Sequence, residues 1–225
     1  MPKKPAPAQR RARTPDQKED RRAAILAAAG AYTRDCGFDS VTMAGLAKRA
    51  GLAKGTLYLY FETREEVFLA LYLDALANWA ARIADTLTPG MSDDVAIAAF
   101  ATTARSDPLF VALASRLSSV IEQNVPMATL VAAKRTSLPI YLSVARQLEA
   151  SLGLAAGDGL RFGSALMALL LGAAEIDTGN LATRDDLPDD VRDLVALSRF
   201  ETVFGDGVRL LLAGMRQSPG PKPSR

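Results

Sequence analysis

The segment that decides the fold is residues 43–62, which read MAGLAKRAGLAKGTLYLYFE. Two short helices that cross at a steep angle need a small residue where they meet and a Gly-like residue with positive φ in the turn between them. Ala47, Gly51 and Leu57 stand at this spacing, and Leu46 adds an apolar contact inside the angle. The segment therefore predicts a helix-turn-helix with Leu46, Ala47, Gly51 and Leu57 as its scaffold.

The outward side chains around the second of these helices have the chemistry of DNA contacts. Lys54 stands at the helix N-terminus, where the helix dipole also favours phosphate, and Gly55 permits a close approach of the backbone. Hydroxyls and phenols in this region can bond phosphates or base edges. Taken singly, each residue also fits ordinary packing or a solvated charge, and only their combination favours DNA. The predicted contacts are Thr42, Lys54, Gly55, Thr56, Tyr58, Tyr60 and Arg64.

Helical signals extend outward from this segment in both directions. A first helix should begin near Thr14, where a hydroxyl precedes Pro, and end before Gly37. A capping box at residues 63–66 opens a long helix to about Thr86. No alternating strand pattern follows, so the fold class is predicted as all-α, with an N-terminal three-helix head and a C-terminal helical body. The further helices are expected at about 92–105, 108–122, 126–152, 157–174 and 190–214.

Charge and composition predict how the chain is organised. Residues 1–64 hold 13 Lys and Arg against 6 Asp and Glu, and residues 65–225 hold 14 against 19. A basic head on an acidic body suggests that the head meets a polyanion, although chance clustering on a solvated surface gives the same counts. The predicted domains are a disordered basic arm at 1–13, a helix-turn-helix domain at 14–64, a helical domain at 65–215 and a flexible tail at 216–225.

Several classes of protein are disfavoured by what the sequence lacks. The chain of 225 residues has no histidine, which removes Ser-His-Asp and Cys-His sites and most zinc sites. We therefore expect no enzyme, no metal and no cofactor. Cys36 is expected to be a small packed residue rather than a thiol sensor. The chain opens without a secretory signal, and its longest apolar run, near 165–174, is too short for a membrane span, so a soluble cytoplasmic protein is expected.

Residues 18–70 resemble the head of the tetracycline-repressor-like (TetR/AcrR) family of bacterial regulators. The resemblance is most specific in the run Lys54–Phe61, KGTLYLYF. It implies DNA contacts at the seven positions given above and a core role for Phe61. The matching stretches are RAAILAAA at 22–29, Gly37-Phe38, Val41-Thr42, LAKRAGL at 46–52, KGTLY at 54–58, Tyr60-Phe61 and EEVF at 65–68.

Three positions depart from the family pattern. Ala53 replaces a usual Ser or Thr, so the second helix of the motif lacks a side-chain cap, at a cost of roughly 0.5–2 kcal/mol. Gly45 replaces a polar helix-forming residue inside the first helix of the motif. Leu59 stands where a polar or aromatic residue is common, and it would touch a thymine methyl only if it faces the groove.

The resemblance also implies what the body does, namely dimerisation and effector binding. The expected function is a ligand-responsive regulator, in the family's usual mode a repressor, that binds a palindromic DNA operator as a homodimer through residues of about 157–174 and 190–214. The alternative is a helical small-molecule binding protein without DNA function. Polar groups on apolar helices, with aromatic and Met neighbours, are candidates for a pocket that takes a mostly apolar effector. They are Phe100, Arg105, Phe110, Arg116, Glu122, Tyr141, Arg146, Phe162, Met167 and Glu175.

Overall fold

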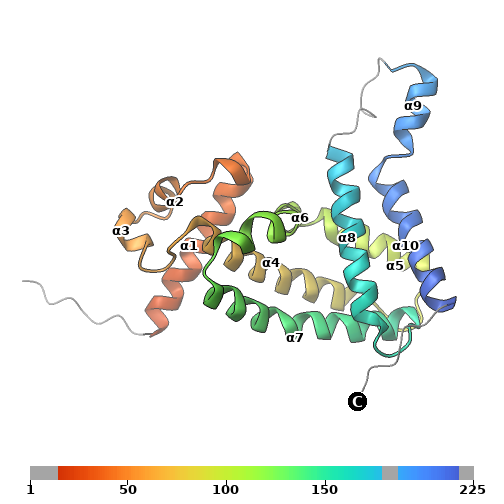
Figure 1. The fold of residues 1–225 in the computed structure, drawn as a ribbon, viewed down its shortest axis with the longest axis horizontal. Helices are drawn as coiled ribbons and strands as arrows, with labels where there is room; N and C mark the ends of the chain where they lie inside the picture. Colours follow the sequence, from red (N-terminus) through yellow and green to blue (C-terminus); the bar gives the residue numbers. More distant parts are fainter. Residues whose placement is uncertain (1–14, 179–186, 218–225) are drawn as a thin grey trace, which may run out of the picture. The chain divides into compact units, whose positions relative to one another are not determined.

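A computed structural model describes residues 15–178 and 187–217, and every regular element in these ranges is a helix (Figure 1). The chain divides into two compact units, residues 1–64 and 65–225, here called the head and the body. The predicted all-α class, with a helix-turn-helix head and a helical body, is confirmed. The Thr14 cap, the basic arm at 1–13 and most of the tail lie outside the described residues.

The head is built from three helices and a short 3-10 turn. Ile25, Leu46 and Leu57 are fully buried and join the three helices in one core. Gly37, at φ +80° and ψ 160°, follows the first helix with a positive φ that favours glycine, at the position where the sequence predicts that the helix ends. The elements are α1 (Pro15–Cys36), η1 (Phe38–Ser40), α2 (Met43–Arg49) and α3 (Lys54–Leu57).

The turn between α2 and α3 is a Schellman motif centred on Gly51. The N–H of Leu52 donates to the carbonyl of Ala47 at 2.9 Å, and the N–H of Gly51 donates to the carbonyl of Lys48 at 3.2 Å. Gly51 has φ +65°, which a side chain would strain. Ala47 is buried. These contacts fix the direction in which the chain leaves α2 and enters α3.

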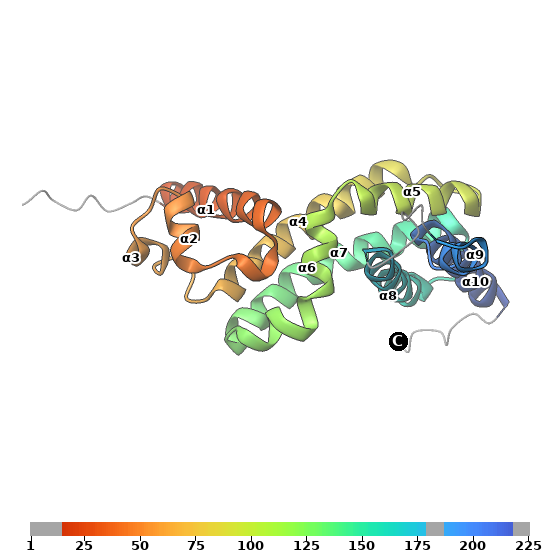
Figure 2. The ribbon, with the colours of Figure 1, turned by 90° about the horizontal axis from the view of Figure 1, so that it is seen from above.

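The body is a set of helices around the buried side of α4. Phe68, Leu76 and Ile83 of α4 are completely or almost completely buried. Helix α8 packs against both α7 and α10, and α10 also packs against α5 (Figure 2). The elements are α4 (Arg64–Thr86), α5 (Asp93–Arg105), α6 (Pro108–Ser115), η2 (Leu117–Ile121), η3 (Glu122–Asn124), α7 (Met127–Leu152), α8 (Asp158–Thr178), α9 (Asp189–Ala196) and α10 (Phe200–Gln217).

The expected single helix at 108–122 is wrong. The α-helix ends at Ser115, and a π-helical segment, η2, follows. The carbonyl of Arg116 accepts from the N–H of both Val120 and Ile121 at 3.0 Å, and the second of these bonds spans five residues, which widens the turn. Ile121, the last residue of this segment, is fully buried.

The expected single helix at 190–214 is also wrong, because the chain breaks between α9 and α10. An uninterrupted helix over 190–214 would place five apolar residues along one side, namely Leu194, Leu197, Phe204, Val208 and Leu211. Phe204 and Val208 are buried, whereas Leu194 and Leu197 are about two-thirds exposed. The break turns the apolar side of α9 away from the core that α10 joins.

Two described helices are long and apolar enough to cross a membrane, residues 64–86 and 158–176. This differs from the sequence expectation, which considered only the uninterrupted apolar run. Length and composition alone are weak evidence for a span, because the core helix of a soluble protein has the same properties. More than half of the apolar window of α4 is buried inside the protein, as in such a core helix.

Candidate nucleic-acid interface and body cavity

The segment that follows the Schellman turn exposes three side chains of different chemistry. Lys54 is exposed, Tyr58 is 42% exposed and Leu59 is 75% exposed. The Lys54 ammonium lies 5.9 Å from the centre of the Tyr58 ring, close enough for a cation–π contact. Gly55 is also exposed, and a Cβ there would meet nothing within 4 Å. The head thus presents a cation, a phenol and an apolar side chain on one short stretch.

Two predicted DNA contacts have structural partners inside the head. The hydroxyl oxygen of Thr42 accepts from the N–H of Gly45 at 3.1 Å and so caps α2, while its own O–H proton remains a donor. The guanidinium of Arg64 donates to the carbonyl of Val41 at 3.2 Å and stacks over Phe38 at 5.6 Å. Thr42 is exposed and Arg64 is half-buried. The remaining two, Thr56 and Tyr60, are half-buried.

The start of α3 has no side-chain cap, as the alanine at position 53 predicts. Ala53 lies in extended conformation, and its carbonyl accepts from the N–H of Thr56 at 2.9 Å and of Leu57 at 3.3 Å. The helix proper covers only Lys54–Leu57, and hydrogen-bonded turns continue to Phe61. The α-helical part of this element is therefore only four residues long.

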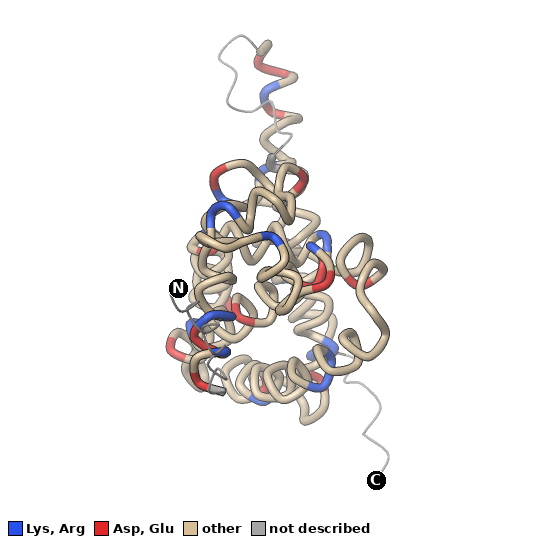
Figure 3. The backbone as a smooth tube through the Cα atoms, turned by 90° about the vertical axis from the view of Figure 1, so that its left-hand side faces the viewer, with Lys and Arg blue, Asp and Glu red and all other residues tan. Residues whose placement is uncertain are grey.

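Gly45 has a packing role that sequence spacing does not reveal. A Cβ at this position would lie 2.8 Å from ring carbons of Tyr32 on α1, so the aromatic ring lies directly against the α2 backbone. The Arg49 guanidinium covers the same ring at 4.6 Å from its centre and forms an ion pair with Asp35. This cluster, Tyr32, Asp35, Gly45 and Arg49, clamps α1 to α2. Basic and acidic positions of the backbone are marked in Figure 3.

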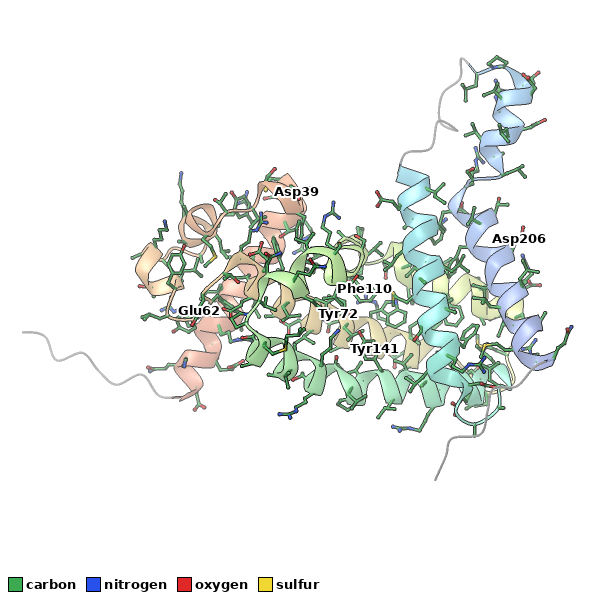
Figure 4. The ribbon with its side chains drawn as sticks, in the orientation of Figure 1. Asp39, Glu62, Tyr72, Phe110, Tyr141 and Asp206 are labelled. Carbon is green, nitrogen blue, oxygen red and sulfur yellow. The ribbon has the colours of Figure 1, made fainter. Side chains whose placement is uncertain are left out.

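The body contains a cavity of about 520 Å³ between four of its α-helices and the π-helical segment. This volume lies within the range of small-molecule sites. The hydroxyl oxygens of Tyr72 and Tyr141 are 2.6 Å apart at its wall, where one phenol donates to the other (Figure 4). Burial, together with nearby Tyr141 and Glu122, raises the pKa of the Tyr72 phenol above its usual range. The Tyr72 phenol is therefore a neutral hydrogen-bonding group at neutral pH.

Two aromatic side chains of α4 form part of the cavity wall, and a third ring, Phe110, packs behind them. Phe110 of α6 stacks on Tyr72 with ring centres 6.0 Å apart and on Trp79 with ring centres 5.4 Å apart. Phe110 is completely buried, whereas Tyr72 and Trp79 both line the cavity. The two α4 residues are seven apart and so lie on one face of the helix.

The apolar part of the cavity lies mainly against α7 and α8. The backbones of these two helices are in close contact at Gly159, where a Cβ would collide with the backbone of Ala145. The carboxylate of Glu149 accepts from the N–H of Gly157 and of Gly159, both at 2.9 Å, and so ties the start of α8 to α7. The apolar lining residues of these helices are Leu138, Val144, Ala145, Leu148, Leu160, Leu166, Met167, Ala168 and Leu171.

The predicted pocket residues separate into distinct places in the structure. Glu122, Tyr141 and Met167 line the cavity. The aromatic candidates Phe100, Phe110 and Phe162 are buried in the core behind it and do not line it, because their rings pack on other rings. The other candidates lie outside the cavity: Arg105 pairs with Glu201, Arg146 is exposed, and Arg116 and Glu175 border a separate open hollow with Ser115 and Leu171.

Sequence reasoning missed the contribution of α4 and the cation that accompanies Glu122. The predicted pocket residues include neither Tyr72 nor Trp79, although their spacing of seven residues places both on one face of the long helix. Lys134 of α7 forms an ion pair with Glu122 and lines the cavity. No local pattern marks Lys134, because its partner lies on another element.

Comparison with known proteins identifies the family of both units. Residues 25–71 match the model of bacterial regulatory proteins of the tetR family, and residues 73–219 match the model of a tetracyclin repressor-like C-terminal domain. Together the two models cover most of the chain.

Individual relatives agree with this result. The chain is 37% identical over 75 residues to the HTH-type transcriptional regulator EthR of Mycobacterium tuberculosis, across 33% of this chain and 34% of that protein. It is 28% identical over 71 residues to the fatty acid metabolism regulator protein of Bacillus subtilis, across 32% and 37% of the two chains. The matches thus span about a third of the length of these relatives.

A solved structure shares the fold over nearly the whole chain. The crystal structure of Thermus thermophilus FadR, a TetR-family repressor in complex with lauroyl-CoA, has a TM-score of 0.56 and 23% sequence identity, and the match covers 89% of this chain and 98% of that one. At 23% sequence identity, this similarity shows only that the two proteins share a fold. From the two family models, this chain belongs to the tetracycline-repressor family of bacterial regulatory proteins.

Proposed function

We propose that this chain is a ligand-responsive transcriptional repressor that binds a palindromic DNA operator as a homodimer. In this proposal the head reads the DNA, and a small, mostly apolar effector in the body alters or releases the complex. A soluble, cytoplasmic location and the absence of enzymatic activity belong to the same proposal.

The observation that carries the DNA-binding part is the exposed segment after the Gly51 turn. Lys54 and Tyr58 can bond phosphates, which supply most of the affinity, while exposed Leu59 can contact a thymine methyl. Gly55 leaves the backbone open to close approach. Thr42, Thr56, Tyr60 and Arg64 are proposed as further contacts, with Thr42 donating its free hydroxyl proton while its oxygen caps α2.

The dimer part is supported by apolar residues that the single chain leaves exposed. Leu160 and Ile176 of α8 are 43% and 49% exposed, and Leu210 of α10 is 75% exposed. Helices α8 and α10 lie side by side (Figures 1 and 2). Pairing of two chains through α8 and the 190–214 region would bury these exposed apolar side chains.

The effector part is supported by the cavity in the body. Its wall is mostly apolar and carries few polar groups, which is the usual character of a small-molecule site. An effector lowers DNA affinity only if it binds better to a dimer whose heads do not match the operator. The lauroyl-CoA of the Thermus thermophilus structure is an example of an effector-sized ligand in a related fold.

The test is a salt-dependent titration of the protein with the DNA upstream of its own gene. Wild-type protein should bind one fragment selectively, with affinity that falls steeply as salt rises. Replacing Lys54→Ala should weaken binding to all fragments and reduce the slope of log affinity against log salt by about 1. Arg135→Ala, an exposed α7 residue with the same charge change, is the matched control and should leave the affinity nearly unchanged.

The contrary result would be a protein that binds no fragment in a sequence-selective, salt-sensitive manner. Lys54→Ala would then have no effect. That outcome would favour the helical small-molecule binding protein without DNA function.

A further inference from the structure

The cavity of the body has one cluster of paired polar side chains in a mostly apolar wall, which also carries Ser118, Ser164 and the indole N–H of Trp79. Tyr72 and Tyr141 share a hydrogen bond of 2.6 Å, and Glu122 pairs with Lys134 beside them. The phenol pair and the ion pair line the same cavity. An occupant of the cavity would therefore meet its polar partners here.

One hydroxyl proton of the Tyr72–Tyr141 pair has no acceptor among the residues that the structure describes. Two phenols carry two hydroxyl protons, and the bond between Tyr72 and Tyr141 uses one of them. Neither hydroxyl has another acceptor among the residues that the structure describes. Tyr72 is buried and Tyr141 is half-buried, so an acceptor atom supplied by an occupant would stabilise the spare hydroxyl proton.

The charges near the phenols disfavour an ionic occupant. The Glu122 carboxylate, only 18% exposed, is neutralised by Lys134, so the cluster carries no net charge. An anion beside the phenols would lose its hydration and face Glu122. A cation would have to displace Lys134 from its carboxylate, which would leave a charge without its partner.

We propose that the effector is an uncharged, largely apolar molecule whose carbonyl oxygen accepts the spare hydroxyl proton of the Tyr72–Tyr141 pair. Ketones, esters and amides carry such an oxygen. The rest of the molecule lies against the leucine-rich wall formed by α7 and α8. This inference rests on the proposed effector response and names the chemical class of that effector.

The chain offers its own reporter of occupancy. Trp79 is the single tryptophan of the sequence and it lines the cavity. Its fluorescence can be followed during titration of the full-length protein with methyl octyl ketone, decanoate and decylammonium, three probes of similar length. We expect the ketone to bind about tenfold more tightly, or better, than either ion. Oxygen-free n-butylbenzene and the anionic lauroyl-CoA complete the set.

Removing both hydroxyls isolates the proposed bond. In a single variant the remaining phenol can turn its proton toward the effector, so the informative change is the double variant Tyr72→Phe with Tyr141→Phe. Its affinity for the ketone should fall about fivefold, while its affinity for n-butylbenzene should not change. Tyr32→Phe in the head is the matched control and should leave both affinities unchanged.

An infrared spectrum of the bound ketone keeps the test independent of how well the double variant folds. In wild-type protein the carbonyl band should move to lower frequency than in an alkane solvent, because the oxygen accepts a hydrogen bond. An unshifted band in wild-type protein would overturn the proposal. Tighter binding of decanoate, decylammonium or lauroyl-CoA than of the ketone would overturn it as well.

The same protein preparation separates this inference from the proposed function. If the ketone does not bind while selective DNA binding is intact, the effector class is wrong and the repressor function stands. If the ketone binds as expected while no DNA fragment is bound selectively, the regulator function is wrong and the chemistry of the cavity stands.

Discussion

The ring of Tyr32 on α1 occupies the space that a Cβ atom on Gly45 of α2 would need. Such a Cβ would lie 2.8 Å from two ring carbons, closer than real Cβ contacts allow. Arg49 covers the ring at 4.6 Å from its centre, so the ring has little freedom to move without losing that contact. The departure of Gly45 from the family pattern is therefore matched by a large side chain on the neighbouring helix.

This contact predicts that the effect of Gly45→Ala depends on residue 32. In a Tyr32→Ala background the collision is absent, and Gly45→Ala should raise the free energy of unfolding by up to about 1 kcal/mol through helix propensity. In the wild-type background the gain should be lost or reversed, which gives a coupling of about 0.5–3 kcal/mol. Urea unfolding of the four proteins measures it. An equal effect of Gly45→Ala in both backgrounds would contradict the packing account.

A second prediction concerns the close approach of α7 and α8 at the cavity. Gly159→Ala should lower the unfolding temperature, because its Cβ would strike the backbone of Ala145, which cannot rotate away. Gly163→Ala on the same helix is the control, since its Cβ would meet only the Leu148 side chain at an ordinary 3.5 Å. Thermal unfolding should rank the variant at 159 well below the variant at 163. Equal unfolding temperatures would show that the two helices are not in contact at this point.

A third prediction concerns acid stability and the end of α10. Arg216 donates to both carboxylate oxygens of Asp93, at 2.7 and 2.8 Å, and to the carbonyl of Leu152 at 3.0 Å. This contact holds the pKa of Asp93 below its usual value, so its stabilisation is present above about pH 4 and is lost as the pH falls through the lowered pKa.

The pH dependence can be measured by urea unfolding with Asp93→Asn. The variant should be less stable than wild type near neutral pH, and the difference should shrink below about pH 4. Asp189→Asn removes a carboxylate that is 95% exposed and should have little effect at any pH. If the difference in stability between wild type and Asp93→Asn grew on acidification, ionised Asp93 would not be the stabilising form.

A fourth prediction uses two leucines of equal exposure. Leu59 in the head and Leu210 in α10 are both 75% exposed. Leu210→Asp should shift sedimentation velocity toward the monomer, because it places a charge in the proposed dimer face. Leu59→Asp should leave the dimer intact and weaken DNA binding by repelling phosphates. A dimer that survives Leu210→Asp would move the interface away from this part of α10.

The sequence predicts the head well, because its determinants are close together in the chain. Ala47, Gly51 and Leu57 lie within eleven residues and specify the turn, and the uncapped Ala53 follows from the absence of a hydroxyl. Pro and Gly also mark most ends of the body helices. The clamp at Gly45 was not predictable, since its partner Tyr32 lies on another helix.

The body was predicted less completely because its details depend on tertiary contacts. The π-helical turn after Arg116 buries Ile121, and periodicity alone gives no sign of it. The cavity joins Tyr72 to Tyr141, which are 69 residues apart. Apolar spacing identified aromatic residues as pocket walls, but three of them pack in the core, because spacing does not tell a lining ring from a buried one.

Footprinting of wild-type protein on the DNA upstream of its gene tests the central claim most directly. The account predicts two protected half-sites of inverted sequence whose centres are about one helical turn, roughly 10 base pairs, or a multiple of that apart. Lys54→Ala should lose this protection at a protein concentration where Arg135→Ala retains it. No protected palindrome at any concentration, with both variants indistinguishable from wild type, would contradict the claim that this head reads DNA.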